Sequence, residues 1–266
     1  MNIFAYEIKS SLKSALIWAI ALVAVLAALM LGAYPSYSDA KDQILSLLSN
    51  YPPEFLAAFG MKSNTLFSYG GFYSFAFAYL GLMGAIMASS VSISVFSREK
   101  RFKCTDFLLT KPVSRPFVFF AKFFAVLLVI LAVSAVYIAA GIIFYKSAAD
   151  DSVTLQRYFI ALTGFFFNQL FFVGLGVFYA TFAKKVRSVS AAANAIGFAA
   201  FITSALAALL EDAKLEYLAP PKYFEPLTVI ETGSFDTGLV AAAALIFVLC
   251  VGLSFYRYCK SDTVAV

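Results

Sequence analysis

The sequence contains no histidine and only three cysteines among its 266 residues. Without histidine, the chain lacks the commonest metal ligand and the commonest general base of enzymes. The cysteines, Cys104, Cys250 and Cys259, show no C-x-x-C spacing, so they suggest no metal site. The sequence therefore offers no metal site and no catalytic residue that we can name.

Charge is also scarce, because only 13% of the residues are Asp, Glu, Lys or Arg, whereas 62% are hydrophobic. In soluble domains about a quarter of the residues are charged. A chain this apolar must be solvated by lipid over much of its surface. The net charge of +5 does not indicate nucleic acid as a partner, because the basic residues form no single stripe and lie at the ends of apolar runs.

Six apolar runs are long enough to cross a bilayer, which requires roughly 20 residues of helix. None shows the alternation of apolar and polar residues that a transmembrane β-strand needs. The first run is too long for the apolar part of a cleaved signal peptide, and no small-residue cleavage site follows it. We predict an all-α integral membrane protein with one transmembrane domain, whose spans are residues 15–34, 66–96, 117–145, 158–182, 190–210 and 238–256.

Lysine and arginine are distributed unequally between the two sides of this arrangement. One side carries 14 of the 20, in the two termini and in the connections after the second and fourth spans. Eleven of the 15 acidic residues lie on the other side. Because cytoplasmic loops carry an excess of Lys and Arg, both termini are expected to be cytoplasmic.

No Asp, Glu, Lys or Arg falls near the middle of a predicted span, which argues against a proton relay or a voltage sensor. The strongest polar residues at depth are Asn168 and Gln169 in the fourth span and Asn194 in the fifth. Two interpretations are open. These amides hydrogen-bond between helices, a contribution of about 0.6–2 kcal/mol, or they line a substrate path.

Residues 97–115 connect the second and third spans on the predicted cytoplasmic side, and they read S-R-E-K-R-F-K-C-T-D-F-L-L-T-K-P-V-S-R. Residues 99–110 can form a short helix, in which Phe102, Asp106 and Leu109 share one face. The proline at 112 ends it, because the residue before a proline is disfavoured in helical conformation. The chain has no Walker A motif, G-x-x-x-x-G-K-[ST], so energy for active transport would have to come from another subunit.

This segment resembles the cytoplasmic loop of permease subunits of ABC type-2 exporters, also called type V ABC transporters. That loop has the pattern E-K-E-x-G-T-L-E-x-L-L-[ST]-x-P-[VI]-[ST]-R, followed by a lysine at the start of the next helix. The chain departs from it at Arg101, which is usually acidic, at Lys103-Cys104, usually Gly-Thr, and at Asp106, usually glutamate. The matching residues are Glu99, Lys100, Leu108, Leu109, Thr110, Pro112, Val113, Ser114, Arg115 and Lys122.

The resemblance implies that residues 97–115 are a cytoplasmic coupling loop, whose short helix fits a groove of a separate ABC ATPase subunit. ATP and Mg²⁺ would be bound by that partner, so the chain itself needs no cofactor and is not expected to be an enzyme. A second copy or a homologue of the permease would complete a pathway between the two. Unless these charges only set the topology, the residues expected to couple to the ATPase are Glu99, Arg101, Phe102, Lys103, Asp106, Phe107, Leu109 and Arg115.

Three further segments fit the same resemblance. Residues 1–14 carry apolar side chains at helical spacing and are expected either to lie along the inner leaflet or to act as a simple basic anchor. Residues 51–60 look like a loop with the pattern P-E-x-L-x-A-F-G that is common in such permeases. Residues 211–237 are acidic and broken by prolines, and they either turn back into the outer leaflet or form an ordinary solvated loop.

The sequence thus predicts the permease subunit of an ATP-driven exporter in the plasma membrane of a prokaryote. Its aromatic, uncharged spans suit an amphipathic or hydrophobic cargo, with peptides favoured over lipids and drugs. Two alternatives are a passive pore, which would need polar rings along a lumen, and a non-transporting membrane subunit for sensing or immunity. An ATPase gene next to this one would favour the exporter.

Overall fold

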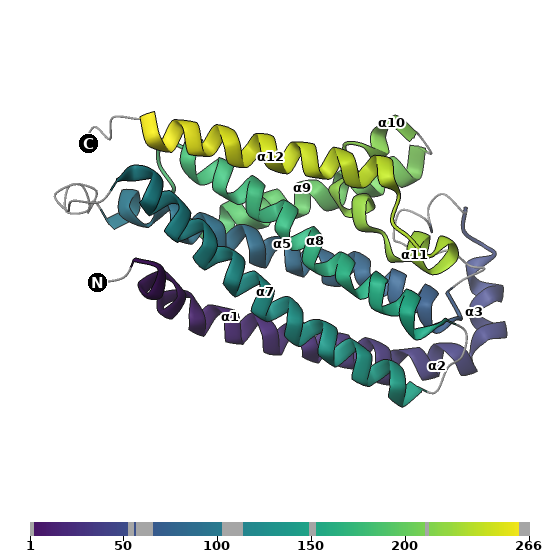
Figure 1. Ribbon diagram of the computed structural model, residues 1–266. Helices are drawn as coiled ribbons and strands as arrows, with labels where there is room; N and C mark the ends of the chain where they lie inside the picture. Colours follow the sequence, from purple (N-terminus) through teal and green to yellow (C-terminus); the bar gives the residue numbers. More distant parts are fainter. Residues whose placement is uncertain are drawn as a thin grey trace.

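The computed structural model describes residues 3–52, 56, 66–102, 114–148, 153–210 and 213–260. The described chain is helical without strands, and six of its helices are long and apolar enough to cross a membrane. This confirms the predicted all-α, six-span architecture. The first span is α1 (Ile3–Ala27), which continues through a π-helical turn, η1 (Ala28–Ala33), into α2 (Tyr34–Asp39). The other five are α5 (Tyr69–Phe102), α7 (Arg115–Ala148), α8 (Leu155–Phe182), α9 (Val189–Leu210) and α12 (Thr237–Lys260) (Figure 1).

Several spans extend beyond the apolar runs that predicted them. Residues 97–102 belong to α5, although they were expected in the coupling loop. They contain no proline or glycine, and Lys100 and Arg101 in the last turn suit the negative end of the helix dipole. At the start of α7, Pro116 occupies the first turn, where its missing N–H costs nothing. The segment 1–14 shows no break from the span that follows it, because α1 is continuous from Ile3.

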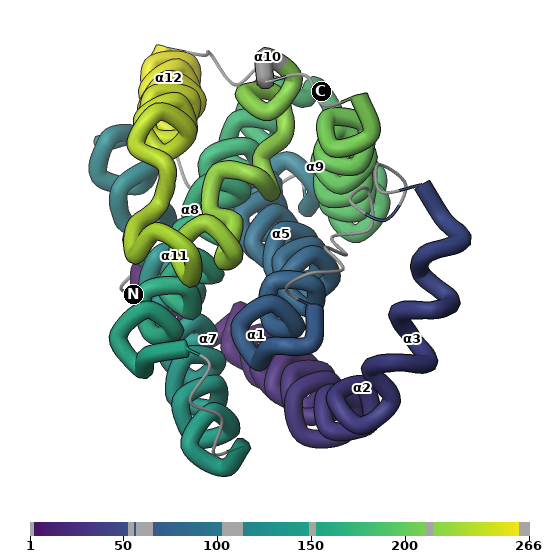
Figure 2. The backbone as a smooth tube through the Cα atoms, turned by 90° about the vertical axis from the view of Figure 1, so that its right-hand side faces the viewer, coloured from purple at the N-terminus to yellow at the C-terminus, as the bar shows by residue number. Residues whose placement is uncertain are grey.

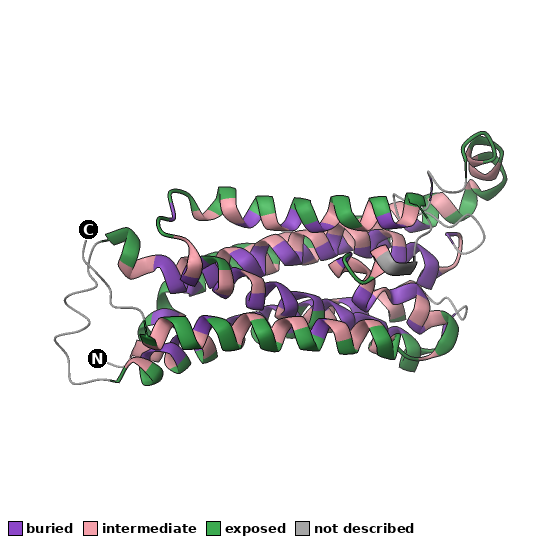
Figure 3. Ribbon diagram, turned by 90° about the horizontal axis from the view of Figure 1, so that it is seen from above, coloured by how far each residue is buried: buried purple, intermediate pink, exposed green. Residues whose placement is uncertain are grey.

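Two helices form the centre of the bundle. Most residues in the apolar stretches of α5 and α8 are buried, 72% and 67%, against at most 39% in any other span. Figure 3 shows the buried residues along the middle of the bundle and the exposed ones along its outer helices. Seen from the end in Figure 2, α1 and α7 lie on one side of this pair, and α9 and α12 lie on the other.

Both ends of the described chain lie at the same end of the bundle (Figure 1). The last turn of α5, the first turn of α7 and the connection from α8 to α9 lie there too. We call this the basic end, because many lysines and arginines lie there. Those among the described residues are Lys9, Lys13, Arg98, Lys100, Arg101, Arg115, Lys122, Lys184, Lys185, Arg187, Arg257 and Lys260. The opposite end carries α2 and α3 (Lys41–Leu48), and the turns that connect α9 to α12.

The connection from α9 to α12 contains three short helical pieces, α10 (Ala213–Glu216), η2 (Pro220–Phe224) and α11 (Pro226–Thr232). Both η2 and α11 pack against α8, and the Phe224 ring stacks on Phe167 with centroids 5.8 Å apart. Burial raises the pKa of the neighbouring Tyr223 phenol, whose hydroxyl donates to the Tyr217 carbonyl oxygen. The apolar residues among the acids of this segment therefore hold it against the bundle.

Candidate functional site

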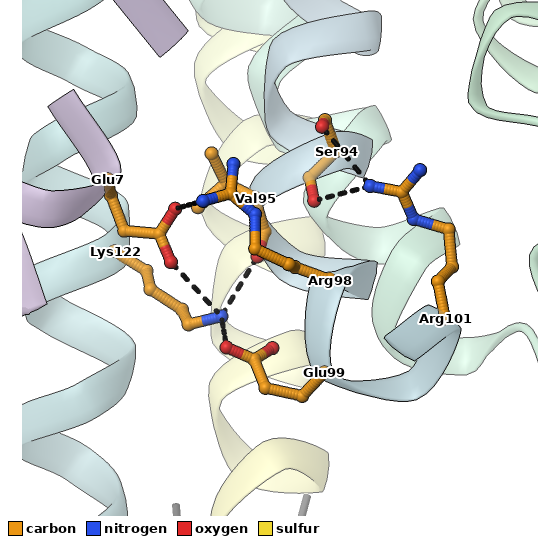
Figure 4. Close-up of polar contacts among 7 residues, drawn as sticks. All are labelled: Glu7, Ser94, Val95, Arg98, Glu99, Arg101 and Lys122. Atoms are coloured by element: carbon orange, nitrogen blue, oxygen red, sulfur yellow. Dashed lines mark hydrogen bonds and ion pairs between the residues drawn. The ribbon is translucent and has the colours of Figure 1, made fainter. Parts of the chain in front are cut away.

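Four charged side chains meet at the basic end, where α1, α5 and α7 come together (Figure 4). Arg98 Nη1 lies 2.9 Å from Glu7 Oε2, in an ion pair rather than an aligned hydrogen bond. Lys122 Nζ lies 3.8 Å from Glu7 Oε1, pairs directly with Glu99 and donates to the Val95 carbonyl oxygen at 2.9 Å. We call Glu7, Arg98, Glu99 and Lys122 the charged junction.

Two members of the charged junction are almost completely removed from solvent, and the other two, Arg98 and Glu99, are 13% and 17% exposed. The Lys122 side chain is 0% exposed and that of Glu7 is 2% exposed. Taking such charges out of water is expensive unless opposite charges and hydrogen bonds compensate them. Two carboxylates and two cations balance here, so each depends on the others. The junction therefore fixes α1 and α7 to the last turns of α5, next to the segment that resembles a coupling loop.

The described residues on either side of residues 103–113 are also attached to the bundle. Arg101 Nη2 donates to the Ser94 carbonyl and hydroxyl oxygens, both at 3.3 Å. On the other side, Arg115 Nη1 donates to the Cys259 carbonyl oxygen in α12 at 3.3 Å. Phe102, the last residue of α5, is 67% exposed. Four of the predicted coupling residues, Lys103, Asp106, Phe107 and Leu109, lie outside the described residues.

A lysine of α5 caps the C-terminal end of α8. Lys100 Nζ donates to the carbonyl oxygens of Ala180 and Thr181, at 3.0 and 3.1 Å, and more weakly to that of Ala183 at 3.4 Å. The last carbonyl groups of a helix have no partner within it, and a cation suits that end of the dipole. These contacts connect the last turn of α5 to the C-terminal end of α8.

The polar residues predicted at depth fall into two groups. Asn168 Nδ2 donates to the Gly81 carbonyl oxygen at 3.0 Å, joining α8 to α5. Gln169 Oε1 accepts from the Ser134 hydroxyl at 2.5 Å, joining α8 to α7. Both amides are buried and hydrogen-bonded between helices. Asn194 differs, since it is exposed on the outer face of α9 and its amide has no partner among the described residues.

A small cavity of about 60 Å³ opens at the opposite end of the bundle, between α5, α9 and the connection from α9 to α12. Its walls include the rings of Phe77 and Phe201, the hydroxyl-bearing Ser74, and Lys222 beside Glu225. Lys222 Nζ pairs with Glu225 Oε1 at 3.2 Å. A ligand pocket is typically 300–1,000 Å³, so this cavity suits one side chain or one end of a larger molecule.

Glu7 is a member of the site that sequence reasoning did not identify. The spacing of Glu7, Ser11 and Ala15, which follow one another every four residues, could have indicated that they share one face of a helix. In the structure all three are buried in α1. Lys122 was recognised only as a motif residue and a topological charge, yet it is the centre of the junction. A lysine within an apolar helix needs a nearby acid, and that requirement could have suggested a partner for it.

A family model described as ABC-2 family transporter protein matches residues 1–263, which include all six spans, the charged junction and residues 103–113. No curated protein matches the sequence.

Proposed function

Because the chain belongs to the ABC-2 family of transporter proteins, we propose that it is the permease subunit of an ATP-driven exporter whose ATPase is a separate chain. The observation that carries the proposal is the match of this family over residues 1–263 of a six-span chain without a Walker A motif. We place the basic end in the cytoplasm of a prokaryote, where the ATPase subunit binds ATP and Mg²⁺.

In this proposal, the movement of the ATPase is transmitted to the permease through residues 103–113. When two ATPase subunits close around ATP, a helix seated in their surface moves with them. The contacts beside that segment distribute the movement to the spans. Lys100 connects it to α8, Arg115 to α12, and the Glu99–Lys122 pair to α7, while Glu7 carries it on to α1.

We propose that the pathway lies between two copies, or two homologues, of this chain. Within one bundle, the amides of Asn168 and Gln169 are hydrogen-bonded to neighbouring helices, so they are not free to line a path. Asn194 points outward from α9, where an unpaired amide facing hydrocarbon is costly. A second permease would place this amide beside a shared path or against a polar group of its own.

Asn194→Asp tests that placement. A carboxylate within the membrane costs about 2.5–3.5 kcal/mol, so transport should fall severalfold in vesicles, while ATP hydrolysis by the complex continues. Ser190→Asp is the matched control, because it adds the same charge one turn nearer the basic end on the same helix. If Asn194→Asp transports as well as this control, Asn194 does not line the path.

The cargo we propose is amphipathic, with a peptide favoured over a lipid or a drug. The spans are aromatic and uncharged at depth, which disfavours ions and sugars. The small cavity at the opposite end combines two phenylalanine rings with a Lys222–Glu225 pair. Such walls would accept an apolar side chain whose neighbours are polar or charged.

The double variant Asp106→Ala/Leu109→Ala tests the coupling directly. Interface anchors commonly contribute about 2 kcal/mol or more, so losing both should separate ATP hydrolysis from transport in the reconstituted complex. Membrane insertion should be unchanged. Asp42→Ala/Leu45→Ala has the same residue types and spacing in α3 at the opposite end, and it serves as the control. Normal transport by the first variant would show that this segment does not couple the two subunits.

A further inference from the structure

Cations from three segments of the chain gather at one corner of the basic end. The Arg257 guanidinium of α12 lies 4.6 Å from the centre of the Phe182 ring, at the end of α8. The ammonium group of Lys100 lies 3.4 Å from the Ala183 carbonyl oxygen, and Lys184 and Lys185 follow in the chain. The corner is therefore built around the last residue of α8.

None of these cations forms an ion pair with an acid among the described residues. Glu99 is the one carboxylate in the described last turns of α5, α8 and α12 and in residues 183–188, and it pairs with Lys122. Lys260 Nζ donates to the Tyr256 hydroxyl at 2.9 Å, which is uncharged. Lys100 donates only to carbonyl oxygens among the described residues. In the part of the chain that the structure describes, this corner therefore holds several cations without an acidic partner.

An exposed apolar stripe on α12 leads to the same corner. Leu245, Leu249 and Leu253 follow one another at intervals of four residues, and Tyr256 continues the stripe; each is at least 50% exposed. Only 11% of the apolar stretch of α12 is buried, the lowest share of the six spans. A stripe of this kind is covered by acyl chains in a bilayer.

We propose that an anionic phospholipid of the cytoplasmic leaflet binds at this corner, with its phosphate between Arg257, Lys260 and Lys184 and its acyl chains along the α12 stripe. Basic pockets between membrane helices on the cytoplasmic side are suited to anionic headgroups. Arginine donates two parallel hydrogen bonds to a phosphate, and the Phe182 ring holds its guanidinium in place. The continuity of cations with an apolar stripe favours a lipid over an acidic protein surface. The site depends on the membrane location of the chain and not on what it transports.

The test compares two double variants of the full chain, purified from membranes in mild detergent. Arg257→Gln/Lys260→Gln removes two charges at the proposed site, and Lys9→Gln/Lys13→Gln removes two exposed charges from α1 at the same end. Phosphatidylglycerol or phosphatidylcholine is added, and bound lipids are counted by native mass spectrometry. Each basic residue near an anionic surface adds about fivefold in affinity. Arg257→Gln/Lys260→Gln should therefore bind phosphatidylglycerol about thirtyfold less tightly than the unmodified chain.

The proposal requires that the unmodified chain prefers phosphatidylglycerol to phosphatidylcholine and that the α1 control keeps this preference. Arg257→Lys/Lys260→Arg retains the charges, so it should retain most of the binding and excludes misfolding as the cause of the loss. Equal losses in both neutralised variants would show a general effect of charge and overturn the site. Unchanged lipid binding in Arg257→Gln/Lys260→Gln would also overturn it, and loss of a co-purified protein in that case would assign the corner to protein docking.

Discussion

Lys122→Met should lower the free energy of unfolding by about 3–5 kcal/mol, the range found when one member of a buried ion pair is removed. The variant leaves Glu7 and Glu99 with only Arg98 to balance them, at a point where Glu7 is 2% exposed. Thermal unfolding of the detergent-purified chain, followed by helical circular dichroism, measures the change. The yield of folded protein from membranes should fall with it.

Two further variants make this expectation specific. Lys146→Met removes an exposed lysine near the other end of the same helix and should have little effect. Lys122→Met/Glu99→Gln removes both partners, so it should recover part of the lost stability in a double-mutant cycle. If Lys122→Met is as stable as Lys146→Met, the charged junction does not hold the three helices together.

Gly176→Val should separate the two central helices. A Cβ at this position would lie 2.0 Å from Ser92 Oγ and 3.1 Å from both the Cα and the carbonyl oxygen of Ser89. Backbone atoms of a central helix cannot yield as a flexible side chain can, so the cost should reach or exceed the roughly 1–3 kcal/mol typical of overpacking. The midpoint of thermal unfolding is the measurement.

Gly252→Val is the matched control for this substitution. It makes the same change in α12, where a Cβ would meet nothing within 4 Å. Gly252→Val should unfold at nearly the same temperature as the unmodified chain. Equal midpoints for the two variants would mean that α5 and α8 do not approach as closely as described.

The spans could be predicted from sequence because their signal is local. Runs of about 20 apolar residues leave helix as the only way to satisfy the backbone in lipid. The ends were less predictable, since residues 97–102 are charged and were assigned to a loop, although the helix continues through them. Charge alone does not end a helix when Lys100 can donate to carbonyl groups of α8.

The charged junction could be predicted only in part. The motif around Glu99 and Lys122 was visible, but which side chains pair depends on how α1, α5 and α7 pack. Glu7 is 92 residues from Glu99 in the sequence, and both contact the same ammonium group. The different roles of the two asparagines could not be predicted for the same reason. Asn168 is hydrogen-bonded to Gly81 and Asn194 is exposed on α9, but nothing in the local sequence distinguishes them.

The central claim is that this permease works with a separate ATPase, and co-purification tests it most directly. The tagged chain would be isolated from its native membranes in mild detergent, the accompanying proteins identified, and ATP hydrolysis measured. We expect a stoichiometric partner with a Walker A motif and ATP hydrolysis in the purified sample. A folded chain that purifies without a partner and without ATPase activity would contradict the claim and favour a pore or a sensory membrane subunit.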